Sequence, residues 1–145
     1  MIVGIRRKLL QTAIVAVCFL PLACSSSEGG PQVYPVSGEV FLNGAPAAGA
    51  LVHFHPTDDD ERAAAFAVVQ EDGSFELSTF GTNDGAEAGD YVVTLNWRDE
   101  EKVDGEMING PDRFHDRYSS RAKSNLHATV EPGENVVPRF DLKDQ

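Results

Sequence analysis

Two histidines that lie two residues apart are the first candidates for chemistry in this sequence. His53 and His55 fall in an alternating segment, so both imidazoles should point to the same face of a strand. There they could hold a divalent metal if His115 or His127 supplied a third ligand. The alternative is that both rings face solvent on either side of a buried Phe54, since no neighbouring residue fixes a third ligand.

Carboxylates form a second group of candidates, because Ca²⁺ prefers oxygen ligands. Asp58, Asp60, Asp84 and Glu87 could supply them if the loops that carry these residues meet at one end of the fold. The first loop is a contiguous acidic run over residues 58–61, whereas a calcium loop normally alternates ligands with spacers and a glycine. The alternative is a solvated acidic loop that protects a sheet edge.

Three aromatic residues form a third group. Trp97 is the only tryptophan of the chain, and Phe114 and Tyr118 follow it within a strongly charged stretch. If these rings are exposed, they can stack on a sugar or on a partner protein. The alternative is that Trp97 and Tyr118 pin the charged stretch back onto the rest of the fold.

Nucleophilic catalysis has no signature in this chain. The sequence contains neither a Gly-x-Ser-x-Gly elbow nor a cysteine in a reactive context. Paired carboxylates of the glycosidase kind need a walled cleft, for which a small sandwich rarely has room. We therefore expect a protein that is not an enzyme and that has no cofactor.

Residues 1–23 have the composition of a secretory signal peptide. Arg6, Arg7 and Lys8 precede a mostly apolar run over residues 9–22, and small residues follow it. This run of fourteen residues is shorter than the roughly twenty that a membrane-spanning helix needs. The alternative is a short anchor that is not cleaved.

Cys24 stands directly after this apolar run, as in a bacterial lipobox, and residues 24–32 form a flexible Ser- and Gly-rich tether. Pro21 and Leu22 depart from the usual lipobox, which has a leucine and then a small residue there, whereas Ala23 conforms. We predict that Cys24 carries lipid, which would hold the domain at a membrane without a spanning helix. The alternative is ordinary cleavage near Ala23 or Ser25, which would release a secreted or periplasmic domain.

The charge balance restricts the partners. The chain has 12 Lys and Arg residues against 23 Asp and Glu residues, a formal net charge of −11. A phosphate backbone would be repelled, so nucleic acid is not an expected partner. We expect contact with a membrane through the lipid anchor, and with an envelope protein or polysaccharide.

Residues 33–145 carry the elements that must position these groups. Apolar residues recur there with period two, and turn residues such as Asn43-Gly44 separate the runs. The pattern predicts an all-β domain, a seven-stranded antiparallel Greek-key β-sandwich of transthyretin-like or immunoglobulin-like type. The expected strands cover residues 34–42, 50–55, 63–70, 74–80, 91–97, 126–130 and 135–142.

The stretch 98–123 breaks this spacing, and we expect a charged excursion with one helical turn near residues 112–118. Alternate positions of the expected strands should form the core. Twelve apolar residues occupy those positions: Val40, Leu42, Val52, Phe54, Phe66, Val68, Phe75, Leu77, Tyr91, Val93, Leu95 and Phe140.

A series of short motifs carries a resemblance to a known class. The motifs cover residues 34–40, 43–46, 49–56, 72–80, 84–86, 89–95 and 128–133. In this order they resemble the small envelope lipoproteins of planctomycete-type bacteria, whose domains are similar to carboxypeptidase regulatory-like and transthyretin-like β-sandwiches. The resemblance spans nearly all of residues 33–141. It implies a β-sandwich in the cell envelope and no enzymatic activity, so it brings no catalytic residues.

These expectations combine into one functional hypothesis. The chain is expected to be a non-enzymatic, membrane-tethered lipoprotein that faces the periplasm or the cell surface and acts as a structural or binding module. The alternative is a carbohydrate- or Ca²⁺-binding adaptor that uses residues 98–123 or the acidic loops.

Overall fold

Strands make up all the regular secondary structure in the computed structural model, which describes residues 30–57 and 61–143. The expected signal peptide, Cys24, Asp58 and Asp60 lie outside these residues. Thirteen strands occur in the described part of the chain: β1 (Val33–Tyr34), β2 (Val36–Leu42), β3 (Ala45–Pro46), β4 (Leu51–Pro56), β5 (Ala65–Val68), β6 (Ser74–Glu76), β7 (Ala86–Glu87), β8 (Gly89–Asn96), β9 (Arg98–Val103), β10 (Glu106–Asp112), β11 (Leu126–Val130), β12 (Asn135–Val136) and β13 (Phe140–Leu142).

The all-β prediction is confirmed, and the strands form several sheets, as a β-sandwich requires. The strand count exceeds seven for several reasons. Two of the extra strands, β3 and β7, are two-residue pairings outside the expected strands. Proline lacks the backbone N–H that a ladder needs, so Pro35 separates β1 from β2. In addition, residues 137–139 divide the last expected strand into β12 and β13, and the excursion contains two strands of its own.

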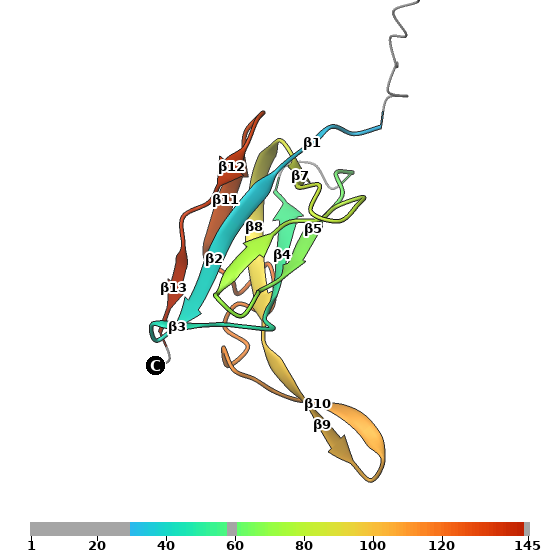
Figure 1. The fold of residues 1–145 in the computed structure, drawn as a ribbon, viewed down its shortest axis with the longest axis vertical. Coiled ribbons are helices and arrows are strands. Elements are labelled where there is room, and N and C mark those ends of the chain that lie inside the picture. The colour runs from blue at the N-terminus through green and yellow to red at the C-terminus, as the bar shows by residue number, and fades with distance from the viewer. Residues whose placement is uncertain (1–29, 58–60, 144–145) are drawn as a thin grey trace, which may run out of the picture.

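The first sheet is antiparallel throughout, with the order β11-β8-β4-β5. The strand β8 lies inside this sheet, between β11 and β4, as predicted for residues 91–97. Val52 pairs with Leu95 and Phe54 pairs with Val93, so these inward side chains share one face. Figure 1 shows the long ribbons of β4 and β8 side by side.

The second sheet is mixed, so the antiparallel prediction is wrong for its last strands. Both β12 and β13 run parallel to β2, whereas β3 and β6 pair with β2 in the antiparallel sense. The physical reason is the connection over residues 131–134. It carries the chain from β11 in the first sheet across to the second sheet instead of folding it back as a hairpin, and a crossover can deliver a parallel strand.

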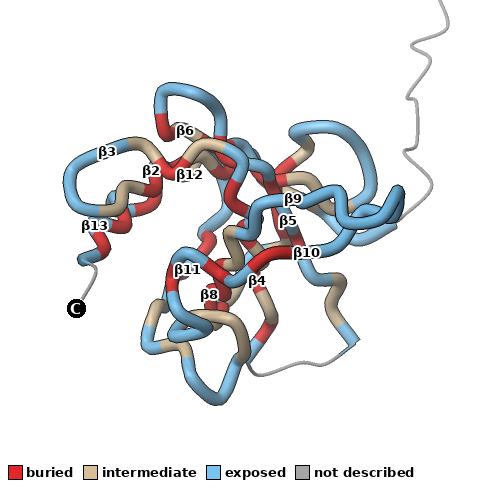
Figure 2. The backbone as a smooth tube through the Cα atoms, turned by 90° about the horizontal axis from the view of Figure 1, so that it is seen from below, coloured by how far each residue is buried: buried red, intermediate tan, exposed pale blue. Residues whose placement is uncertain are grey.

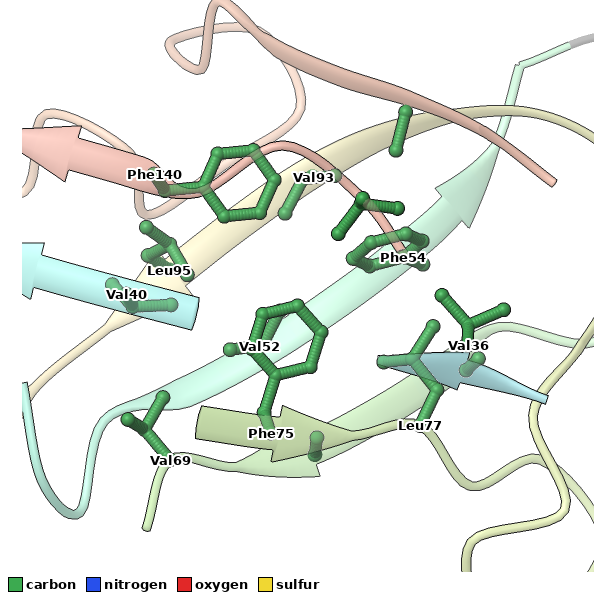
Figure 3. Packing of buried hydrophobic residues seen from close by; sticks show 14 of the residues in the cluster. Val36, Val40, Val52, Phe54, Val69, Phe75, Leu77, Val93, Leu95 and Phe140 are labelled. Carbon is green, nitrogen blue, oxygen red and sulfur yellow. The ribbon is translucent and has the colours of Figure 1, made fainter. Parts of the chain in front are cut away.

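The core lies between the two sheets (Figure 3). Phe54 and Phe75 are fully buried, and their rings meet edge to face with centroids 6.3 Å apart. Tyr91 packs on Phe54 at 5.7 Å and donates its hydroxyl to the carbonyl of Glu87, which satisfies the one polar group that it buries. Alternate residues thus bury apolar area, which drives folding.

Two residues of the expected core face outward instead. Phe66 and Val68 are about half exposed, while Ala65 and Ala67 are buried. The register explains this, because Phe66 pairs with His53, and cross-strand partners share a face. A strand whose phase is misjudged by one residue has all its side chains assigned to the wrong face.

The excursion contains a hairpin and a turn-rich segment but no helical turn. The strands β9 and β10 pair with each other and hang beyond the end of the sandwich (Figure 1). After Asp112 the chain makes successive turns, and both His115 and Asp116 have positive φ, at 54° and 55°. Positive φ lies outside the right-handed helical region, which explains why no helix forms there.

The two ends of the sandwich differ. The short pair β1–β7 lies at the end where the described chain begins, whereas the β9–β10 hairpin projects from the opposite end (Figure 1). Gly85 allows the β1–β7 end to close, because its φ is +96° and an added Cβ would lie 1.7 Å from the carbonyl oxygen of Tyr34. Within residues 30–57 and 61–143, no helix is long and apolar enough to cross a membrane.

Candidate functional site

The histidine pair lies on the outer face of the first sheet. The rings of His53 and His55 stack with centroids 6.0 Å apart, and Nε2 of His55 is 2.9 Å from the hydroxyl of Thr94. Burial lowers the pKa of His53. Burial, followed by the charges of His53 and Arg121, also lowers the pKa of His55. In the described part of the chain, no three His, Cys, Asp or Glu side chains gather as a metal site would need.

Asp84 and Glu87, which are two of the candidate calcium ligands, bond backbone amides. The carboxylate of Asp84 accepts hydrogen bonds from the amides of Thr79, Phe80 and Gly81 at 2.7, 3.0 and 2.7 Å. Partial burial raises the pKa of Asp84, but the hydrogen bonds from these amides together lower it by a larger amount. The net pKa of Asp84 therefore lies below its ordinary value. Glu87 accepts a hydrogen bond from the amide of Ala63.

These bonds give the two carboxylates a structural role in the loops that carry them. Since Asp58 and Asp60 lie outside the described residues, the calcium site stays a prediction. It is tested by whether millimolar Ca²⁺ raises the melting temperature, because a ligand that binds only the native state stabilises it.

The three aromatic candidates do come together, at the junction between the sandwich and the hairpin. The ring of Phe114, which is buried, lies 5.7 Å from that of Trp97 and 6.1 Å from that of Tyr118. The guanidinium of Arg113 lies over the Trp97 ring, 4.5 Å from its centroid. Trp97 and Tyr118 are half-buried against the core, so the cluster packs the excursion onto the sandwich and leaves no bare aromatic platform.

Asp112 is the buried charge at this junction, and sequence analysis missed it. It is 4% exposed, and its two carboxylate oxygens accept hydrogen bonds from the amides of Trp97 (2.7 Å) and Asp116 (2.9 Å). The side chain therefore ties the base of β10 both to the end of β8 and to the turns that follow. Nothing in its sequence neighbourhood distinguishes it from the many other acidic residues of the excursion.

The hairpin itself has two unlike faces. Cross-strand partners share a face, so Glu101, Val103, Glu106 and Ile108 form one face, called here the aliphatic–acidic face. The other face carries Lys102 and Met107 among polar neighbours. Every residue of β9 is exposed, as Figure 2 also shows, and Val103, Met107 and Ile108 are 45%, 61% and 44% exposed.

A groove of about 840 Å³ lies on the second sheet, and sequence analysis missed this too. Pairing of Ser37 with Glu76 and of Glu39 with Ser74 places all four side chains on the solvent face of β2 and β6. Asn83, from the 79–84 loop, also lines the groove. The period-two pattern marks these positions as outward-facing but does not tell which loop lies beside them.

Comparison with known proteins gives structural similarities at low identity. No protein-family model and no curated protein matches the chain. Similar solved structures include a DUF3823 family protein from Parabacteroides merdae, with a TM-score of 0.42 and 15% identity over 77% of this chain and 46% of that one. Another is a 9R-lipoxygenase from Cyanothece, with a TM-score of 0.42 and 8% identity over 77% of this chain and 16% of that one. The chain thus spans less than half the length of either protein.

Proposed function

We propose that the chain is a non-enzymatic module of the cell envelope, tethered to a membrane by lipid on Cys24, that binds an envelope protein through the β9–β10 hairpin. The finer family assignment belongs to this proposal: a Greek-key, transthyretin-like sandwich of the planctomycete-type lipoprotein class. The order of the sequence motifs supports that assignment. The module faces the periplasm or the cell surface.

The observation that carries the proposal is the position of the hairpin. The described chain begins beside β1 at one end of the sandwich, and the hairpin projects from the other end (Figure 1). A tether through Cys24 would join the sandwich on the β1 side. The hairpin would then point away from the membrane, where a partner can reach it.

Exposure of the hairpin supports a binding role over a structural one. A strand that stabilises a sandwich buries alternate residues, whereas β9 buries none and β10 is buried only at its base. A two-stranded hairpin is marginally stable alone, so a long exposed one contributes little to the fold. The aliphatic side chains of Val103 and Ile108 are exposed on one face of this hairpin, and exposed apolar side chains that lie together are suited to contact with a partner.

The tether is tested by intact mass of the protein extracted from membranes of its own host, with Cys24→Ala as the control. We expect the mass of the chain from Cys24 onward plus a diacylglycerol and acyl groups, and loss of that addition in the variant. A soluble product of unmodified mass would overturn the tether and leave a secreted binding domain.

The binding role is tested separately, by photocrosslinking in intact cells. A photoreactive residue at Ile108 should give a discrete adduct, whereas one at Thr129 on the outer face of β11 should not. Equal labelling from both positions would argue against the hairpin as the contact element.

A second candidate function is a carbohydrate-binding adaptor. The groove on the second sheet favours it, because hydroxyl, carboxylate and amide groups line a single concave surface. The aromatic cluster around Trp97 does not favour it, since Arg113 covers the indole ring.

A further inference from the structure

We infer that the groove on the second sheet is a binding site for an oligosaccharide, an inference that rests on the second candidate function above. Its volume of about 840 Å³ lies within the range of small-molecule sites, roughly 300–1,000 Å³. The groove extends from β12 across β2 and β6 to the segment after β5, where the amide of Gln70 bonds the carbonyl of Ser74. It therefore crosses several neighbouring segments of the fold, as an elongated ligand requires.

The lining supplies hydrogen-bond donors and acceptors in similar measure. Glu39 and Glu76 accept, Arg139 and the amides of Asn83 and Gln70 donate, and the serine hydroxyls do both. A sugar hydroxyl also donates and accepts, so it can use both kinds of group at once. Exposed aliphatic side chains, among them Val136 at 76% exposure, lie beside these groups and can contact the C–H faces of a sugar ring.

Several of these polar groups are already held in place. The Asn83 amide donates to Oε2 of Glu76 at 2.7 Å, and the backbone amide of Asn83 donates to the hydroxyl of Ser78. The carboxylate of Asp84 accepts hydrogen bonds from three backbone amides of the same loop. Asp84 therefore acts as a positioning residue for Asn83. Side chains that are fixed before binding lose less conformational entropy when the ligand binds, and this raises the affinity for a polar ligand.

Arg139 is oriented by two contacts of its own. Its guanidinium lies over the ring of Phe41, 4.8 Å from the centroid, and its Nε donates to Asp141 at 3.1 Å. The planar guanidinium of Arg139 thereby lines the groove with its charge partly balanced by Asp141. This arrangement suits a neutral hydroxyl-rich ligand better than an anion.

Two other occupants fit less well. A peptide added as a strand needs an unpaired sheet edge, but β2 at the centre of the groove is flanked by β6 on one side and by β12 and β13 on the other. A metal ion needs a gathered set of ligands, which the described residues do not provide.

The inference is tested with the mature protein, from Cys24 onward, held in lipid nanodiscs. It is titrated with three defined tetrasaccharides, cellotetraose, chitotetraose and maltotetraose, and binding is measured by calorimetry. We expect saturable binding of at least one tetrasaccharide at millimolar concentration. Asn83→Gly should weaken it about tenfold, because the amide is lost while glycine keeps the positive φ of 55°. Asn109→Gly, a matched change on the hairpin, should leave the affinity unchanged.

The result of the tetrasaccharide titration does not depend on the result of the mass measurement at Cys24. Absence of binding by all three tetrasaccharides, or equal weakening by Asn83→Gly and Asn109→Gly, would overturn the inference whatever the mass of Cys24. If Cys24 proves unmodified, the soluble mature chain is titrated in the same way, and binding that Asn83→Gly weakens would support the groove even though the tether had failed.

Discussion

The sandwich and the β9–β10 hairpin are built from the same kind of paired strand, yet their side chains have opposite surroundings. Buried residues alternate with less buried ones along most of β2, β4 and β8, whereas β9 is exposed along its whole length. The hairpin is closed by Asp104 and Gly105, whose φ values of 52° and 89° are typical of a type I′ turn. Turn geometry and backbone pairing can therefore form a strand pair that has no core, whereas the stability of the sandwich comes from the burial of apolar side chains.

The largest effect should come from the sandwich. Phe54→Ala removes a fully buried ring that contacts Phe75 and Tyr91, and it should lower the free energy of unfolding by about 3–5 kcal/mol. Phe66→Ala, a matched change at a position 49% exposed, should cost about 1 kcal/mol or less. Urea unfolding, monitored by circular dichroism, measures the free energy of unfolding of both variants. Similar decreases would mean that Phe54 is not more buried than Phe66.

Much of the sandwich could be predicted because its signals are local. The Asn43-Gly44 turn marks the end of β2 and has the positive φ values that a tight hairpin turn needs, 53° and 82°. The parallel pairing of β12 and β13 with β2 was missed, since no local signal tells which sheet a returning strand will join. The hairpin was also missed, although Asp104-Gly105 is the same kind of turn signal, because its flanking residues do not alternate between apolar and polar.

The next largest effect should come from the junction between the two regions. Asp112→Ala leaves the amides of Trp97 and Asp116 without their acceptor, and we expect a loss of about 2–3 kcal/mol in the free energy of unfolding. Asp112→Asn keeps one carbonyl acceptor and should lose less. Hydrogen exchange at the two amides is the specific measurement, and unchanged protection in Asp112→Ala would show that the carboxylate is not what holds the junction.

A smaller effect is expected on the exposed side of the same junction. Arg113→Ala removes the cation–π contact with Trp97 and the ion pair with Asp99, both partly solvated, so it should cost about 1 kcal/mol or less. Uncovering the indole should shift the emission of the only tryptophan to longer wavelength. Arg139→Ala, which removes a similar stack from Phe41 instead, is the control and should leave the emission unchanged.

The candidate site was predictable only in part, for the same reason as the fold. The aromatic residues Trp97, Phe114 and Tyr118 are close enough in sequence to be grouped, and they do lie together. The groove depends on contacts between distant segments, since Ser37 pairs with Glu76 across the sheet. A period-two pattern shows which residues face outward, but it does not show which outward residues become neighbours.

The smallest effect on stability should come from the hairpin, which is the sharpest test of the comparison. Val103→Thr combined with Ile108→Thr removes the aliphatic groups of the aliphatic–acidic face and keeps the β-branched shape that favours a strand. Because both residues are more than two-fifths exposed, the free energy of unfolding should change by about 0.5 kcal/mol or less. A photoreactive residue at Glu106, on the same face, should nevertheless give a weaker adduct, because the aliphatic groups proposed to contact the partner are replaced by more polar ones. A loss of stability as large as that of Asp112→Ala would mean that the hairpin packs on the sandwich, and the contrast between the two regions would not hold.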